Sequence, residues 1–147
     1  MVFFPSYKMM QDVFSIYQDE YDNPCVDWVI QTPSMAFAID VYHYRADELA
    51  PYIDFYASTH IHTDHKSEKL MKAMYDASKP VLSNFYEPQK NYQYYSTGTK
   101  DYTVGDCALH TFITRHNNGS TNVPVTVFQI DCGPDTGNFV LMHSGDS

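Results

Sequence analysis

The sequence predicts a single α/β domain that spans residues 1–147. Short apolar segments of strand length precede residue 60, and a segment with helical spacing of apolar side chains follows it. From residue 108 onward, apolar or alternating segments are separated by turn sequences, which is typical of consecutive strands. A chain of 147 residues with 44% hydrophobic and 18% charged residues is long enough and apolar enough to form one packed core.

Helical and strand patterns alternate in the first half of the chain. The clearest helical spacing is that of Leu70, Met71 and Met74, before Pro80 ends the helix. The elements that we expect before residue 84 are, in order, a helix over 9–20 that is broken at 22–24, strands over 26–30 and 35–39, a helical turn over 47–52, a strand over 53–57, a helix over 66–78 and a short strand over 81–83.

The second half of the chain is predicted to be a polar loop followed by strands alone. Residues 84–100 are polar and rich in tyrosine, with no periodicity, so we expect an ordered loop or insertion there. Strands are expected over 108–115, 123–130 and 138–143, separated by turn sequences that contain Gly119 and Gly133.

The charge and the cysteines limit the classes of partner and compartment. The formal net charge is −9 and no run of Lys or Arg is present, so the sequence predicts no nucleic-acid partner. It contains no apolar segment of transmembrane length and no secretory signal at its start, which predicts no membrane partner. Cys25, Cys107 and Cys132 are odd in number and unpatterned, so we expect packing residues in a reducing cytoplasm.

One loop concentrates residues that bind metals, because the run from Thr59 to His65 reads THIHTDH between a predicted strand and a predicted helix. His60 and His62 are two positions apart in extended backbone, so both rings can face one side and share one cation. Asp64 and His65 are adjacent and cannot both face that cation, but a change of backbone direction can aim them at a second one. A single histidine is usually a surface or core residue, whereas four potential metal ligands within six positions favour a site for two cations.

Two later residues are candidates to complete this site. His116 follows a predicted strand and precedes a turn at Asn117, so it lies where loops gather over a sheet edge. Asp146 closes the last predicted strand after Gly145, and its carboxylate is a group that can bridge two cations.

The THIHTDH run, the later histidine and the strand that ends in Gly145 and Asp146 together resemble the metallo-β-lactamase superfamily. The resemblance implies that His60, His62 and His116 bind a first metal, that Asp64 and His65 bind a second, and that Asp146 bridges the two. Asp40, at the end of an apolar strand, is similar to the family's first-motif aspartate, which orients the ligand loop by hydrogen bonding without binding metal. The segments 53–60 and 143–147 look similar to the branch that contains L-ascorbate-6-phosphate lactonase.

The same resemblance implies an αββα sandwich that is truncated at its C-terminal side. The family continues past the Gly-Asp strand into a second βα half, which supplies one more histidine to the second metal, whereas this sequence stops at Ser147. We therefore expect a fragment, or a second chain that completes the fold, and self-association or a partner over the exposed apolar sheet. His43, His110 and His143 are expected to be non-ligands.

The predicted activity is hydrolysis with two divalent metal ions, zinc first and manganese or iron as alternatives. A hydroxide held between two cations is a nucleophile at neutral pH, and Asp64 is the candidate catalytic residue that orients it or carries its proton. The expected substrate is a small molecule, with a lactone or another ester or amide favoured. Two alternatives stay open: an inert metal-binding fragment or assembly domain, and a phosphodiesterase or nuclease-like member of the superfamily.

Overall fold

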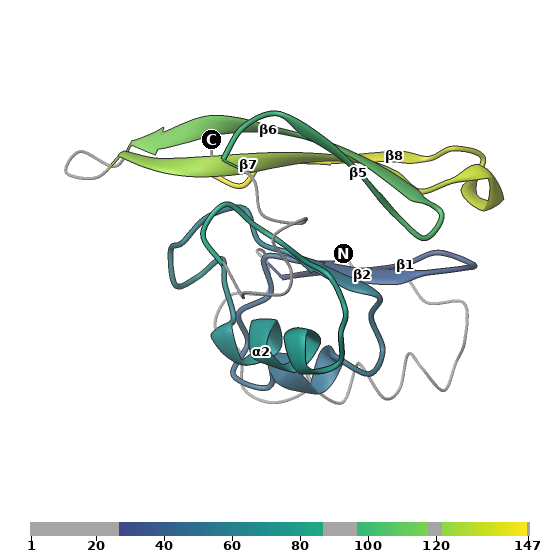
Figure 1. The fold of residues 1–147 in the computed structure, drawn as a ribbon, viewed down its shortest axis with the longest axis horizontal. Helices are drawn as coiled ribbons and strands as arrows, with labels where there is room; N and C mark the ends of the chain where they lie inside the picture. The colour runs from purple at the N-terminus through teal and green to yellow at the C-terminus, as the bar shows by residue number, and fades with distance from the viewer. Residues whose placement is uncertain (1–26, 87–96, 118–121, 147) are drawn as a thin grey trace.

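The computed structural model describes residues 27–86, 97–117 and 122–146, which form two stacked four-stranded β-sheets with helical segments beneath one of them (Figure 1). The first sheet contains β1 (Trp28–Gln31), β2 (Ala36–Ile39), β3 (Phe55–Ala57) and β4 (Val81–Leu82), in the order β1-β2-β3-β4. The second sheet contains β5 (Lys100–Val104), β6 (Cys107–Asn117), β7 (Asn122–Asp131) and β8 (Val140–His143), in the order β5-β6-β7-β8. The helical segments beneath the first sheet are η1 (Ala46–Leu49) and α2 (Glu68–Asp76), whereas η3 (Pro134–Thr136) connects β7 and β8 at the end of the second sheet.

Strand directions bring several strand ends to one edge of each sheet. In the first sheet β2, β3 and β4 are mutually parallel, whereas β1 is antiparallel to β2. In the second sheet every neighbouring pair is antiparallel, so β6 and β8 run in the same direction. Residues that follow β2, β3 and β4 therefore lie together, as do residues that follow β6 and β8.

The strand β2 separates two layers of core because its side chains alternate between the faces of the sheet. Phe37 and Ile39 point toward the second sheet, and Phe37 stacks on Phe55 with ring centroids 4.6 Å apart. Ala36 and Ala38 point the other way, toward α2 and η1. All four β2 side chains are buried, which accounts for the uninterrupted apolar sequence of this strand.

The helix α2 closes the outer face of the first sheet. Its N-cap Ser67 accepts a hydrogen bond from Leu70 N at 3.1 Å, which satisfies one of the free donors of the first turn. Leu70, Met71 and Met74 are buried against the sheet, as their spacing predicts. The position of α2 matters for the site because the loop that precedes it carries the histidine-rich run.

The expectation of an α/β, αββα sandwich is wrong. The protein is mostly β, with two sheets of four strands, and α2 is the single α-helix of the described ranges. It lies with η1 on the outer face of the first sheet, and no helix of residues 27–86, 97–117 and 122–146 covers the second sheet (Figure 1). The physical reason is the alternation along β6, where Leu109 and Thr111 are buried but Ala108 and His110 are exposed, because an antiparallel sheet can leave one face in water.

Several element predictions agree with the structure and one element was missed. The strands and the helix expected between residues 26 and 83 are present with boundaries shifted by no more than two residues, apart from the helical turn, which is the short 3-10 segment η1. The strand β5 was not predicted, because its sequence KDYTV is largely polar and follows a tyrosine-rich stretch without a boundary. The helix expected over 9–20, the break at 22–24, Cys25 and most of the tyrosine-rich segment lie outside the described residues. Among the described helices, none is long and apolar enough to cross a membrane.

Candidate metal centre

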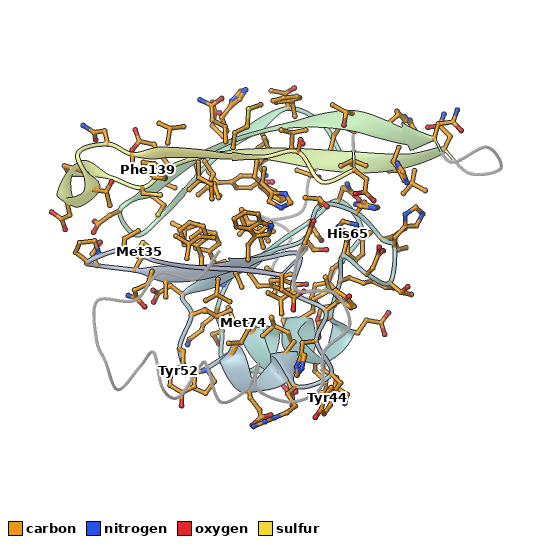
Figure 2. The ribbon with its side chains drawn as sticks, turned by 180° about the vertical axis from the view of Figure 1, so that it is seen from behind. Met35, Tyr44, Tyr52, His65, Met74 and Phe139 are labelled. Atoms are coloured by element: carbon orange, nitrogen blue, oxygen red, sulfur yellow. The ribbon has the colours of Figure 1, made fainter. Side chains whose placement is uncertain are left out.

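Residues from four strand ends meet at one edge of the sandwich. Asp40 directly follows β2, the run from Thr59 to His65 lies in the loop after β3, His116 is near the end of β6, and Asp146 follows β8. Figure 2 shows His65 between the two layers, at the end of the molecule opposite Phe139 and Met35. Loops that follow parallel strands are the usual place for a binding site, and the directions of these strands deliver polar side chains there.

The imidazole and carboxylate groups expected to bind metal form one contiguous cluster. Ligand atoms of His60, His62 and Asp146 all lie within 4.8 Å of one another. His65 Nε2 is 3.0 Å and His60 Nε2 is 3.7 Å from Asp146 Oδ2, and His116 Nε2 is 4.0 Å from the same oxygen. Zinc ligands stand roughly 2.0–2.2 Å from the ion, so atoms 3–4 Å apart can share one cation.

Asp40 is buried beneath this cluster and holds its parts together. Its Oδ1 accepts a hydrogen bond from Thr59 N at 2.7 Å, and its Oδ2 lies 2.7 Å from Thr59 Oγ1 and 2.8 Å from His65 Nδ1. The residue has a positive φ of 53°, a conformation that Asp adopts more readily than most side chains. Its side chain is fully buried, so its three partners replace the water that a carboxylate would otherwise bind.

Counting the available protons assigns the tautomers of two histidines. A carboxylate only accepts hydrogen bonds, so Thr59 Oγ1 and His65 Nδ1 must both donate to Asp40. The Thr59 hydroxyl has one hydrogen, so at 2.9 Å it must accept from His60 Nδ1. Both rings therefore carry a proton on Nδ1 and direct Nε2 into the cluster, and His60 Nε2 is buried with no hydrogen-bond partner.

The two buried histidines differ in how readily they take up a second proton. Burial, together with repulsion from His65, lowers the pKa of His60 to about 4, so at neutral pH its Nε2 offers a free lone pair. Burial would also lower the pKa of His65, but the hydrogen bond and charge of Asp40, with Asp146 and Asp64, raise it above the usual 6.5. Their ring centroids are only 4.2 Å apart, so a positive charge on one ring disfavours a positive charge on the other.

No protein-family model and no curated protein matches this chain. The likeness to the metallo-β-lactamase superfamily therefore rests on the residues of this cluster and their order along the chain.

The second sheet contributes the more exposed side of the cluster. The His116 and Asp146 side chains are 23% and 41% exposed. His116 Nδ1 lies 3.1 Å from Asp146 O, so the histidine ring also contacts the backbone of the segment that carries the carboxylate. Gly145 allows this segment to approach Thr59, because an added Cβ at Gly145 would stand 2.7 Å from Thr59 Oγ1.

The structure brings all six expected ligands into this region but groups only three closely enough for one ion. Asp64 Oδ2 is 3.7 Å from His65 Nε2, and its side chain is 56% exposed. Within the described residues the arrangement offers one compact set, His60, His62 and Asp146, and it does not show two ions. Asp40 lies behind the ligands, where its hydrogen bonds orient them.

Two contributions to the site were not expected from the sequence. Thr59 was quoted with the motif but given no role, although it contacts Asp40, His60 and the second sheet, where Thr126 N donates to Thr59 O at 2.8 Å. Asn84, directly after β4 and buried, donates from Nδ2 to Thr59 O at 3.1 Å and to Thr126 Oγ1 at 2.9 Å. The available signal was position alone, since both residues lie one or two positions after a predicted strand.

The three histidines expected to be non-ligands lie outside the compact set. His110 pairs with Asp101 on the exposed surface of β5 and β6. His143 packs edge-on against Trp28 and accepts a hydrogen bond from Gly145 N at 3.2 Å, and burial lowers its pKa. His43 is buried beside η1, where its Nδ1 accepts from Arg45 N at 3.1 Å.

Proposed function

We propose that the protein is a metal-dependent hydrolase that acts on a lactone or on another small ester or amide, with the ligand order of the metallo-β-lactamase superfamily. The observation that carries this proposal is the buried, unpartnered His60 Nε2, aimed at a carboxylate and at further imidazoles. An unsatisfied polar atom in a protein interior is costly, and a cation is the partner that a lone pair among carboxylates fits.

The donor set fits a divalent cation such as zinc, and also manganese or iron. Neutral imidazole nitrogens and carboxylate oxygens are ligands for all three ions. A cation at His60, His62 and Asp146 would acidify a water ligand and polarise the carbonyl group under attack, which is the chemistry of hydrolysis. A second ion, if the site takes one, would fall to Asp64, His65 and the shared Asp146.

The protein's own residues supply orientation and proton transfer. Asp40 and Thr59 hold the Nδ1 protons of His65 and His60, so that both Nε2 atoms stay directed into the cluster. Asp64 is the candidate to carry a proton between the site and water, because its carboxylate lies beside His65 and is half exposed.

A second candidate function is metal binding without catalysis. The observation that favours it is that the described residues form one compact set of ligands, whereas the expected nucleophile is a hydroxide held between two cations. In that case the cation would tie the loop after β3 to the end of the second sheet, and the protein would serve as a binding or assembly domain.

Metal content and hydrolysis, measured on the same preparations, separate these proposals. We would compare the wild-type protein with a His60→Ala, His62→Ala double variant by metal analysis after purification, and assay lactones and activated esters with and without zinc. His110→Ala is the matched control, because this histidine lies outside the cluster and is paired with Asp101.

The expected result for the hydrolase is bound metal and zinc-dependent turnover in the wild type and in His110→Ala, both lost in the double variant. Metal that is retained without turnover of any substrate supports the inert binding domain. Absence of metal from the wild type, even after dialysis against zinc, would overturn both proposals.

A further inference from the structure

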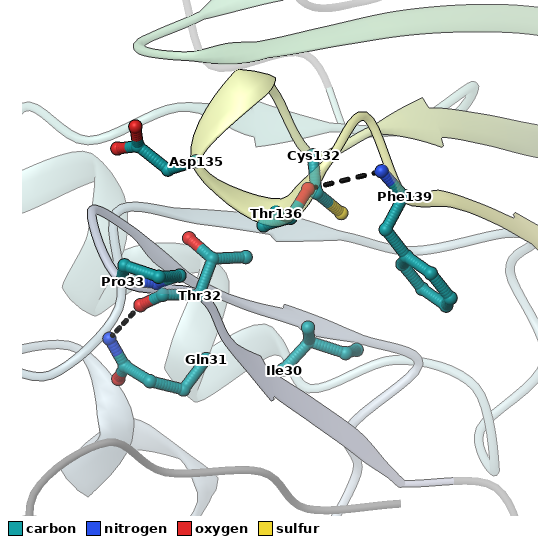
Figure 3. Close-up of a pocket in the computed structure, with 8 residues that line it drawn as sticks. All are labelled: Ile30, Gln31, Thr32, Pro33, Cys132, Asp135, Thr136 and Phe139. Atoms are coloured by element: carbon teal, nitrogen blue, oxygen red, sulfur yellow. Dashed lines mark hydrogen bonds between the residues drawn. The ribbon is translucent and has the colours of Figure 1, made fainter.

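A pocket of about 430 Å³ lies away from the metal cluster, at the end of the molecule that carries Phe139 (Figures 2 and 3). The turn after β1 forms one wall with Ile30, Thr32 and Pro33, and the segment around η3 forms the other with Thr136 and Phe139. A volume of this size falls in the range of small-molecule sites, and apolar carbon forms much of the surface. Nothing in the proposed hydrolysis uses this pocket.

The side-chain hydrogen-bond donors of the lining are already used. They are the Gln31 amide, the Thr32 and Thr136 hydroxyls and the Cys132 thiol. Gln31 Nε2 donates to Thr32 O at 2.9 Å and to Met35 O at 3.2 Å, Thr32 Oγ1 donates to Met35 O at 3.2 Å, and Thr136 Oγ1 donates to Gly133 O at 2.8 Å. The thiol of Cys132 is 4.0 Å from Ile130 O, so it too is directed at a backbone carbonyl.

The acceptors of the same lining are in surplus. Asp135 brings a carboxylate to the rim, and within the described residues it has no ion-pair partner (Figure 3). Gln31 Oε1 is buried under the wall and has no hydrogen-bond partner. No lysine, arginine or histidine is among the lining residues. A ligand that fits this pocket must therefore bring its own donors and a positive charge, together with an apolar body.

We propose that this pocket binds a small amphiphilic amine, with the ammonium group at Asp135 and the apolar chain between Ile30, Pro33 and Phe139. The side chain of Phe139 is 54% exposed, although large apolar groups are usually buried, and an apolar ligand would cover it. The site is independent of the metal cluster, because the two share no residue.

Three eight-carbon probes that differ only in the head group test the proposal. Octylammonium, octanol and octanoate would be titrated below their micelle concentrations into isotope-labelled protein in the presence of a chelator, so that the result does not depend on the metal site. Amide shifts of Thr136 and Phe139 report on the pocket by NMR. We expect octylammonium to bind most tightly and octanoate most weakly.

Two variants and one control assign the head group and the chain. Asp135→Asn should weaken octylammonium about 3- to 10-fold, the loss of one charge-assisted contact, and leave octanol unchanged. Phe139→Ala should weaken all three probes alike. Asp101→Asn removes the same charge from an exposed carboxylate outside the lining and should change nothing. Equal binding of the three probes, shifts that map elsewhere, or an unchanged preference in Asp135→Asn would overturn the proposal.

Discussion

The two halves of the candidate metal centre are built differently. The histidines from the first sheet, His60 and His65, are 0% and 3% exposed. His65 is hydrogen-bonded to Asp40, and His60 is hydrogen-bonded to Thr59, whose hydroxyl donates to Asp40. The groups from the second sheet, His116 and Asp146, are partly exposed, and Asp146 is placed by a short segment after β8. The half from the first sheet is held by buried hydrogen bonds. The half from the second sheet is positioned mainly by the course of the backbone after β8.

This difference predicts that half of the proposed ligand set would be preorganised before a cation binds. Fixed tautomers and fixed ring orientations lower the free-energy cost of ordering the ligands when a cation binds. An exposed carboxylate that can move by a fraction of an ångström can then close on the ion. Substitutions in the buried half should therefore affect both folding and metal affinity, and substitutions in the exposed half should affect mainly metal affinity.

The largest effect is expected at Asp40. Asp40→Ala leaves Thr59 N, Thr59 Oγ1 and His65 Nδ1 as buried donors without an acceptor, and we expect a loss of about 3–5 kcal/mol of unfolding free energy. Asp40→Asn keeps the shape and tolerates the positive φ, and should weaken zinc about 10- to 100-fold. Denaturant unfolding and zinc titration measure the two quantities.

The control for Asp40 is Asp54, a carboxylate of the same sheet that lies before β3 and accepts from Ala36 N at 2.9 Å. Asp54→Asn should leave zinc affinity unchanged. If Asp40→Asn binds zinc as tightly as the wild type, the assignment of Asp40 as the orienting carboxylate is incorrect.

A substitution at Gly145 tests whether the close approach of the segment after β8 to Thr59 affects stability and zinc affinity. In Gly145→Ala the new Cβ would stand 2.7 Å from Thr59 Oγ1 and 3.0 Å from Val125 Cγ1, at a φ of +57°. We expect a loss of about 2–4 kcal/mol and a zinc affinity lower by tenfold or more, because the segment that carries Asp146 must shift.

Gly137 provides a matched comparison, because it has a φ of +70° and nothing lies within 4 Å of an added Cβ. Gly137→Ala should cost only the backbone strain, about 1–2 kcal/mol, with unchanged zinc affinity. Equal effects of the two substitutions would show that close approach at Gly145 is unimportant.

The features that the sequence could predict are those that depend on residues close together along the chain. The ligand run was evident because His60, His62, Asp64 and His65 lie on one loop, where the spacing of residues along the chain determines their spacing in space. Strand β2 was evident from a short uninterrupted apolar segment, and helix α2 was evident from the helical spacing of its apolar residues. These are short-range features, and they require no knowledge of the packing.

The features that escaped prediction depend on contacts between distant segments. Thr59 acquires its role from Asp40, which is 19 positions earlier, and from Thr126 in the other sheet. The αββα sandwich came from the family resemblance and not from any apolar helix pattern after residue 97, so the uncovered second sheet contradicted it. Strand β5 lacked an apolar signal, because only Val104 of its five residues is buried.

Asp27 is a buried carboxyl group of the first sheet that lacks the contacts of Asp40. It accepts from Tyr42 N, but its Oδ2 is buried with no partner, and burial raises its pKa to about 6 from 3.8. Because the folded state holds this proton more tightly than the unfolded state does, its contribution to stability is present below pH 4 and is lost as the pH rises through 6.

Asp27→Asn should therefore stabilise the protein by about 1–3 kcal/mol at pH 7.5 and by little at pH 4. Unfolding by denaturant at the two pH values measures this difference. A gain of the same size at both pH values would show that the carboxyl group does not carry the burial penalty assigned to it.

The smallest change in stability is expected at Thr59, where the readout is the tautomer of His60. Thr59→Val keeps the shape but removes the hydroxyl that accepts from His60 Nδ1, at a cost of about 1–2 kcal/mol. Without that acceptor the tautomer with the proton on Nδ1 is no longer favoured. The population of the tautomer with the proton on Nε2 should therefore increase, and zinc affinity should fall about tenfold. Nitrogen-15 shifts of the His60 ring in the metal-free protein report the tautomer, and Thr59→Ser should restore the wild-type pattern. If the ring of the Thr59→Val variant keeps its Nδ1 proton, Asp40 controls only His65, and the preorganised half of the site is reduced to one histidine.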